Sequence, residues 1–158
     1  MDKDVYIFDI DGTIVKDIFS NLNTFVPVDE ARKLMAEQTI SNNFVTFFNK
    51  IAHNHIYFVT GRQHKFYGDI THNLLKKINI DNNIIFFPDT KQITVENYIK
   101  FKINSIKKII KNHKNQWIII FDDKPLYFKP LYKKIQKINN KISFVYVPHW
   151  DNFWKQYL

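Results

Sequence analysis

The chain lacks cysteine altogether and has only three glycines and five prolines among its 158 residues. Without cysteine there can be no disulfides, thiolate zinc sites or cysteine nucleophiles, which excludes a disulfide-stapled secreted scaffold. No window approaches the ~18 uncharged apolar residues of a membrane span, and acidic residues interrupt the N-terminal apolar run. We therefore expect a cytoplasmic protein with no signal peptide and no membrane partner.

What is present is the composition of a folded domain. Hydrophobic residues make up 45% of the chain, charged residues 24% and aromatic residues 16%, which argues against disorder. Repeats, low-complexity segments and Gly/Ser-rich or Pro-rich linkers are all missing. The sequence thus predicts one domain over residues 1–158, and it leaves the oligomeric state open.

The charge balance is strongly basic, with a formal net charge of +8. A basic surface attracts phosphate-bearing polyanions. However, only Arg32 and Arg62 among the 23 basic residues are arginine, the residue that nucleic-acid interfaces favour. An AT-rich genome would also enrich Lys, Asn and Ile, so both explanations stay open. The lysines at 107, 108, 111 and 114 favour a solvated helix face over a nucleic-acid contact.

Five short runs of β-branched, aromatic and other apolar residues predict strands. Their continuous apolar character indicates that both faces are covered, as in a parallel sheet. The predicted strands are Val5–Asp9, Ile56–Thr60, Ile84–Phe87, Trp117–Asp122 and Ser143–Val147.

Between the strands, the apolar spacing changes to that of helices. We expect helices around Asp29–Glu37 and Ser41–His53, the second capped by Ser41, and a helix that follows Thr94 as its cap. Two further helices are marked by Ile70, Leu74 and Ile78 and by Leu131, Ile135 and Ile138. This alternation predicts an α/β fold: a three-layer sandwich around a Rossmann-like parallel five-stranded sheet.

Two stretches of the sequence bear on whether a cap domain is inserted into the predicted α/β core. The two helices and the loop after the first strand consume the residues from Thr13 to Ile56, and a helix, a strand and a helix start consume Arg62–Lys102. No large cap domain is therefore expected, and the site should be open. The tail residues Trp150, Phe153, Trp154 and Tyr157 have helical spacing and predict a helix that covers one sheet edge.

Polar residues stand where three of the predicted strands end. The first strand runs into Asp9-Ile10-Asp11-Gly12-Thr13, the second into Thr60-Gly61-Arg62 and the fourth into Asp122-Asp123. Ligands of such sheets bind at the carboxyl ends of the strands. Because carboxylates gathered there repel one another, they need a cation, and their hard oxygen ligands suit Mg²⁺.

These motifs resemble those of the haloacid dehalogenase (HAD) superfamily of phosphohydrolases. Asp9-Ile10-Asp11-Gly12-Thr13 is similar to the first family motif and Phe58-Val59-Thr60-Gly61 to the second. Lys102 resembles the lysine of the third motif, and Ile119-Ile120-Phe121-Asp122-Asp123 the acidic fourth motif. The motifs stand in family order, and the resemblance implies a Mg²⁺-dependent phosphatase.

The resemblance also implies residue roles. Asp9 is the expected nucleophile, which forms an aspartyl-phosphate, and Asp11 the expected general acid, which then acts as base on the attacking water. The expected metal ligands are Asp9, the backbone carbonyl of Asp11, Asp122 and, directly or through water, Asp123. The expected phosphate-binding groups come from Gly12, Thr60, Gly61, Arg62 and Lys102.

Several of these residues have alternatives. Lys100 competes with Lys102 for the role of the third-motif lysine. Arg62 is as consistent with a surface ion pair as with a substrate phosphate contact. His64 and His72 fall near the same strand end, where a structural or solvated role is favoured over a substrate contact.

The substrate class follows from the expected open site, because a substrate that itself covers the site would exclude water. Thr60-Gly61-Arg62 followed by Thr71-His72-Asn73-Leu74-Leu75 also resembles the 3′-phosphatase half of polynucleotide kinases. No G-x-x-x-x-G-K-[ST] loop is present, so no kinase half is expected. A nucleic-acid 3′-phosphate end or a nucleotide is the expected substrate. The alternatives are a small-molecule nucleotidase and a catalytically weak nucleic-acid-binding protein of the same fold.

Overall fold

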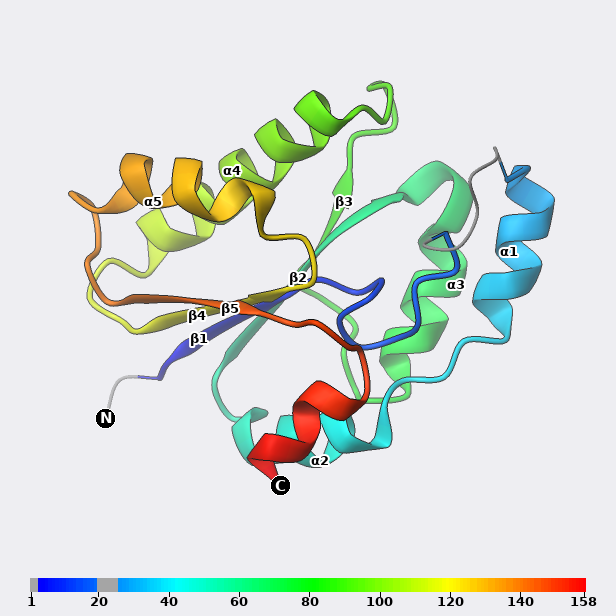
Figure 1. Cartoon of the computed structure of the whole chain (residues 1–158), viewed down its shortest axis with the longest axis horizontal. Coiled ribbons are helices and arrows are strands. Elements are labelled where there is room, and N and C mark those ends of the chain that lie inside the picture. The colour runs from blue at the N-terminus through cyan, green and yellow to red at the C-terminus, as the bar shows by residue number, and fades with distance from the viewer. Residues whose placement is uncertain (1–2, 20–25) are drawn as a thin grey trace.

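The computed structural model describes residues 3–19 and 26–158, and its centre is one parallel sheet (Figure 1). The five strands lie in the order β3-β2-β1-β4-β5, and every neighbouring pair is parallel. They are β1 (Val5–Phe8), β2 (His55–Gln63), β3 (Ile84–Phe87), β4 (Ile118–Asp122) and β5 (Ile142–Tyr146). The predicted five-stranded parallel sheet is confirmed, and nine of the ten strand boundaries agree to within one residue.

The predicted helices are also found. They are α1 (Val28–Ala36), α2 (Asn42–Ile51), α3 (His64–Lys76), α4 (Val95–Asn112) and α5 (Phe128–Ile135), and two 3-10 helices follow as η1 (Pro125–Tyr127) and η2 (Asn152–Tyr157). The Ser41 hydroxyl accepts a hydrogen bond from the Phe44 N–H at 3.1 Å, and the Thr94 hydroxyl accepts one from the Asn97 N–H at 3.1 Å. Both predicted caps thus satisfy donors that a helix start would otherwise leave unpaired.

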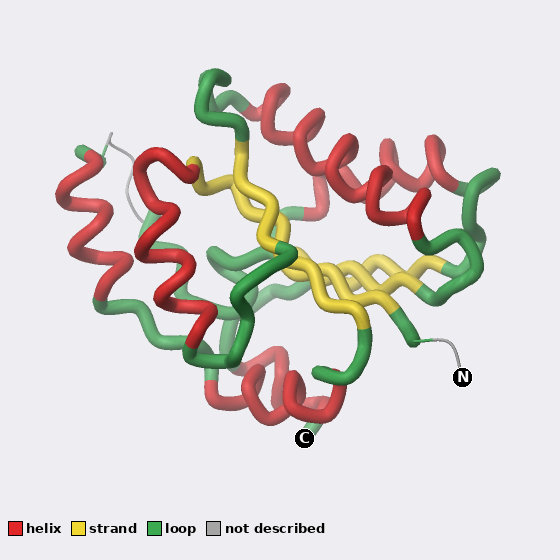
Figure 2. Tube along the Cα trace, turned by 180° about the vertical axis from the view of Figure 1, so that it is seen from behind, coloured by secondary structure: helices red, strands yellow, loops and turns green. Residues whose placement is uncertain are grey.

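The elements form three layers (Figures 1 and 2). α4 and α5 cover one face of the sheet, and α2, α3 and η2 cover the other. α1 packs on the outer side of α3 through Ala31, Met35 and Tyr67. Apolar residues of the strands alternate between the two covering layers, so the sheet is buried on both faces, as the continuous apolar runs predict.

The C-terminal tail differs from the expectation. It forms the 3-10 helix η2 rather than an α-helix, and it lies against the middle of the sheet rather than over an edge. The fully buried ring of Trp154 packs against Phe8 of the central strand β1 and Phe121 of β4, with ring centroids 6.0 and 5.1 Å away. A ring as large as indole is fully buried only where it packs over the middle of the apolar sheet face. The helical spacing of the tail does not predict this position.

β2 also departs from the prediction, because it continues past Thr60 to Gln63. Thr60 pairs with Phe86 and Gln63 with Phe87, so Gly61 and Arg62 are extra residues in β2. Such a bulge redirects side chains at a strand end. The described ranges contain no inserted cap domain, and none of their helices is long and apolar enough to cross a membrane.

Candidate active site

A cavity of about 660 Å³ lies at the carboxyl ends of the central strands. Asp9, which follows β1, and Asp11 line it together with Arg62 from the β2 bulge. Tyr98 of α4 and Lys124, which follows β4, line another part of the wall. The cavity is therefore formed at the sheet edge where the sequence places its polar residues.

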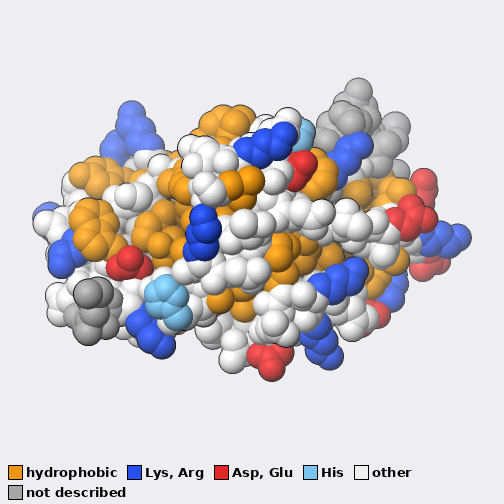
Figure 3. All heavy atoms as spheres, turned by 90° about the horizontal axis from the view of Figure 1, so that it is seen from below, with side chains coloured by type: hydrophobic (Ala, Val, Ile, Leu, Met, Phe, Trp, Pro, Cys, Tyr) orange, Lys and Arg blue, Asp and Glu red, His pale blue; other side chains and the backbone are white. Residues whose placement is uncertain are grey.

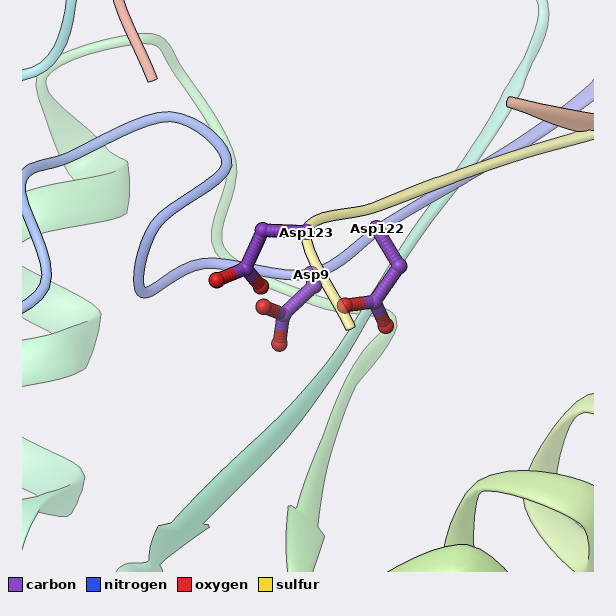
Figure 4. Close-up of side chains that lie close together, drawn as sticks. All are labelled: Asp9, Asp122 and Asp123. Atoms are coloured by element: carbon purple, nitrogen blue, oxygen red, sulfur yellow. The ribbon is translucent and has the colours of Figure 1, made fainter. Parts of the chain in front are cut away.

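Three carboxyl groups gather beside this cavity and are called the acidic triad below: Asp9, Asp122 and Asp123 (Figure 4). One oxygen of each lies within 4.8 Å of the others. Asp9 and Asp122 are buried, with residue exposures of 6% and 0%. Because β1 and β4 are neighbours in the parallel sheet, their carboxyl ends bring these residues together.

Lys102 supplies the buried positive charge that contacts the acidic triad. Its Nζ donates hydrogen bonds to Asp9 Oδ1 at 2.9 Å, to Asp122 Oδ2 at 3.0 Å and to the Val59 carbonyl at 2.7 Å. Burial alone would lower the pKa of Lys102, but Asp122 and Asp9 raise it well above its ordinary value. Lys100, the alternative, is exposed and pairs with Glu96 one helical turn away.

One lysine does not neutralise the acidic triad. Burial, followed by the charge of Asp122, raises the pKa of Asp9 to about 6. Burial, followed by the charge of Asp9, raises the pKa of Asp123 to about 9. Asp123 Oδ1 is buried and has no hydrogen-bond partner among the described residues. A divalent cation would relieve both conditions, and carboxylate oxygens are the ligands that Mg²⁺ prefers, so the triad fits that ion.

Two hydroxyl groups that sequence reasoning did not assign hold the acidic triad in place. The Tyr127 hydroxyl donates to Asp122 Oδ2 at 2.7 Å. The Thr13 hydroxyl oxygen accepts from the Asp123 N–H at 3.2 Å and lies 3.4 Å from Asp9 Oδ2, to which it donates. Thr13 could have been found from its place in the first motif. Tyr127 carries no such signal, because its contact depends on how η1 folds back.

The Asp11 carboxylate lies apart from the acidic triad and is held by Arg62. Arg62 Nε donates to Asp11 Oδ2 at 2.9 Å and Nη2 donates to Oδ1 at 2.8 Å. The same guanidinium donates to Gln38 Oε1 at 2.7 Å and to the Thr71 hydroxyl at 3.1 Å. Burial opposes the ionisation of Asp11, but the Arg62 charge outweighs it and lowers the pKa of Asp11. The surface ion pair considered for Arg62 is thus a buried one.

Close approaches of the backbone explain both glycines of the site. Gly12 has a φ of 80°, and a Cβ there would lie 2.1 Å from Asp123 Oδ2. At Gly61, a Cβ would meet the Tyr98 ring at 3.1 Å. The neighbouring Thr60 is buried, and its hydroxyl oxygen accepts from the Arg62 N–H at 3.1 Å. The predicted phosphate-binding positions therefore surround the same strand ends as the acidic triad.

The two histidines near this end of β2 are packed against a different neighbour. The rings of His64 and His72 lie 5.7 Å apart, and both contact Phe86 of β3. Neither lines the cavity. Their placement agrees with the structural role that the sequence favours.

Comparison with known proteins adds a likeness of fold. No protein-family model matches the chain, and no curated protein matches it. Among solved structures, the HAD domain of the effector protein Lem4 from Legionella pneumophila is similar, with a TM-score of 0.53 at 22% identity over 98% of this chain and 91% of that one. An inactive mutant of the same domain aligns with a TM-score of 0.53 at 21% identity over 99% and 91%. The chain therefore has an HAD-like fold.

Proposed function

We propose that the protein is a Mg²⁺-dependent phosphomonoester hydrolase that acts through an aspartyl-phosphate on Asp9. The observation that carries this proposal is the acidic triad, with Lys102 bound to Asp9 and Asp122 and with the Asp11 carboxylate on the same cavity. The HAD-like fold supports it, since the triad occupies the strand ends where ligands of such sheets bind.

Asp9 performs the first step. Its carboxylate attacks phosphorus, an oxygen–phosphorus bond forms, and the bond to the leaving alcohol breaks while Asp11 protonates the departing oxygen. In the second step Asp11 takes a proton from water, which attacks the same phosphorus and releases phosphate and free Asp9. The Arg62 pair lowers the pKa of Asp11, which favours the ionised form that the second step requires. Before the first step, Asp11 must take up a proton from solvent or from the substrate monoanion, and it passes this proton to the leaving oxygen.

The remaining residues bind and neutralise the phosphate. Lys102 compensates charge on Asp9, while the Thr60 hydroxyl and the Gly61 N–H are donors for phosphoryl oxygens. The Gly12 N–H already donates to the Val15 carbonyl at 2.9 Å, so Gly12 contributes its turn rather than a free donor. Mg²⁺ held by the acidic triad, with the backbone carbonyl of Asp11 as a further ligand, would offset the repulsion between Asp9 and the incoming phosphate.

The proposed substrate is a nucleic-acid 3′-phosphate end or a nucleotide. The net charge of +8 favours polyanions, and no cap domain is inserted in the described ranges, so a long substrate would have access. A small-molecule nucleotidase is the second candidate. It is supported by the cavity of about 660 Å³, whose walls include the aromatic rings of Tyr67 and Tyr98.

Hydrolysis of p-nitrophenyl phosphate tests the reaction, measured with Mg²⁺ and with EDTA. Wild type should turn over only with the metal, and Asp9→Asn should be inactive because an amide is no nucleophile. Asp81→Asn is a matched control, since Asp81 is exposed and lies outside the cavity. Undiminished turnover by Asp9→Asn would overturn the mechanism. Rates on 3′-phosphorylated oligonucleotides and on mononucleotides then separate the two substrate classes.

A further inference from the structure

We infer that the outer surface of α4 and α5 docks the phosphate backbone of a nucleic-acid strand whose phosphorylated end enters the cavity. This inference rests on the proposed function and specifies how its substrate is held. The surface is called the lysine face, and six exposed side chains define it: Lys108 and Lys111 of α4, Lys129, Lys133 and Lys134 of α5, and Lys137 just after α5.

The net positive charge of the chain comes from residues 95–158, the part that includes this face. Residues 1–94 carry 10 basic and 11 acidic side chains, whereas residues 95–158 carry 13 basic and four acidic ones. Two of those four, Asp122 and Asp123, belong to the acidic triad. A general preference for lysine codons would enrich both parts, so composition alone does not account for the asymmetry.

The lysine face connects with the cavity. α4 and α5 lie side by side on one face of the sheet (Figure 1). Tyr98, in the first turn of α4, and Lys124, shortly before α5, both line the cavity. From there α4 runs for 18 residues, or about 27 Å. A strand that leaves the cavity past Lys124 would meet the lysines of both helices in succession.

The charges of the face are available for a partner. None of its six lysines forms an ion pair with any residue that the structure describes. On the opposite side of the molecule, over α2 and η2, basic side chains stand apart from one another among acidic and apolar ones (Figure 3). Lysines without acidic partners can neutralise phosphates, and a nucleic-acid strand gains free energy when it releases its condensed counterions on binding them.

The same surface fits a nucleic acid better than an anionic bilayer. The apolar stripes of both helices are used in the core, since Ile106, Ile110, Leu131 and Ile135 are buried, and a membrane-surface helix needs such a stripe free to insert. Tyr132 is half exposed between Lys129 and Lys133. A flat ring among lysines is the arrangement on which bases of a single strand stack.

The test measures binding of a fluorescent single-stranded oligonucleotide by anisotropy, in EDTA so that no turnover occurs. One variant replaces Lys108, Lys111, Lys133 and Lys137 by Gln. The matched control replaces four exposed lysines elsewhere by Gln and so loses the same charge: Lys33, Lys76, Lys77 and Lys155. Circular dichroism confirms that both variants are folded.

We expect the lysine-face variant to bind at least about tenfold more weakly than wild type, while the control stays within about threefold. The slope of log K against log salt should become shallower by about 2 to 3 in the face variant, at about 0.7 per lost phosphate contact. With Asp9→Asn to prevent turnover and Mg²⁺ in place of EDTA, a 3′-phosphorylated oligonucleotide should bind more tightly than a 3′-hydroxyl one where the strand end sits in the cavity.

Three results would overturn the inference: no measurable binding by wild type, equal losses in both variants, or tighter binding to phosphatidylserine vesicles than to the oligonucleotide. Its failure is distinguishable from that of the proposed function, because the binding assay requires no catalysis. If wild type hydrolyses p-nitrophenyl phosphate but gives one of these three results, the proposed reaction stands and the docking inference is wrong. Binding through the face without turnover of any phosphomonoester contradicts the reaction instead.

Discussion

Arg62 binds Asp11 through two parallel hydrogen bonds of 2.9 and 2.8 Å, although the two residues are 51 positions apart in the chain. Their side chains are only 2% and 16% exposed. The turn after β1 carries the carboxylate, and the bulge of β2 carries the guanidinium. A bidentate pair of this kind fixes the orientation of a carboxylate as well as its charge, so Asp11 is held in position before any substrate arrives.

Replacement of Arg62 by Met should destabilise the fold by about 3 kcal/mol, because it leaves the largely buried Asp11 carboxylate and Gln38 Oε1 without their shared donor. Urea unfolding followed by fluorescence measures the loss. The double variant Arg62→Met with Asp11→Asn should recover part of it, since no unpaired charge remains.

Arg32→Met is the comparison, because Arg32 and Asp69 form an exposed pair. Its loss of stability should be much smaller than that of Arg62→Met. Equal stability of wild type and Arg62→Met would show that the buried pair contributes nothing net.

Lys102→Met should lower kcat by about 100- to 1,000-fold, because Asp9 and Asp122 then repel each other and no charge compensates the nucleophile. Lys100→Met should leave kcat within about twofold, since that side chain is exposed and pairs with the equally exposed Glu96. Both variants are assayed with Mg²⁺ after near-ultraviolet circular dichroism has confirmed native packing. A Lys102→Met variant with more than about a tenth of the wild-type kcat would argue against this role.

The fold was predictable where local pattern and burial agree. Apolar spacing places the strands and helices, and Ser41 and Thr94 mark two helix starts, because caps and buried stripes depend on neighbouring residues in the chain. η2 and the β2 bulge were not predictable, since both depend on partners distant in sequence. The Trp154 ring is held in part by the Thr13 carbonyl, to which its Nε1 donates at 2.8 Å.

The site likewise contains residues that the sequence predicts and contacts that it does not. Motifs at strand ends locate Asp9, Asp122 and Asp123, because parallel strands deliver their carboxyl ends to one edge. The hydrogen-bond partners of the site residues could not be predicted in this way. The Gln38 contact with Arg62 depends on the loop after α1, and Tyr127 reaches Asp122 only because η1 turns back toward β4. Neither relationship has a counterpart in sequence spacing.

Trp154→Phe should lower the free energy of unfolding by about 1 to 2 kcal/mol, because the Thr13 carbonyl, buried in the loop after β1, loses its donor while most of the ring packing is kept. Urea unfolding measures the change. Trp117→Phe is a matched control, since Trp117 is half exposed, and should cost less than about 0.5 kcal/mol. A similar loss in both variants would contradict the importance of the Thr13 contact.

Gly12→Ala should weaken Mg²⁺ binding more than it weakens the fold. The new Cβ would lie 2.1 Å from Asp123 Oδ2 and must displace that carboxylate, while the left-handed φ of 80° adds about 1 kcal/mol of strain. Calorimetric titration with Mg²⁺ should give at least about a tenfold higher Kd, as for other losses at a metal site. An unchanged Kd would mean that Asp123 does not contribute to metal binding.

Mg²⁺ should stabilise the protein more strongly as the pH rises. The pKa values of Asp9 and Asp123 are raised to about 6 and about 9, so without metal the folded chain binds protons more tightly than the unfolded chain. The contribution of these groups to stability therefore falls from about pH 4 upward, through the pKa of Asp9 and toward that of Asp123. Mg²⁺ needs the ionised carboxylates and competes with these protons, so its effect grows over the same window.

Thermal melts with and without millimolar Mg²⁺, at about pH 5.5 and about pH 8, check this prediction. The Mg²⁺-induced rise in Tm should be clearly larger at the higher pH. Asp123→Asn removes the carboxyl group with the more strongly raised pKa, so its metal-free stability should fall less with pH and its response to Mg²⁺ should shrink. A rise in Tm that is equal at both pH values, or larger at the lower one, would show that the ion is not bound by the carboxylates whose protons it must displace.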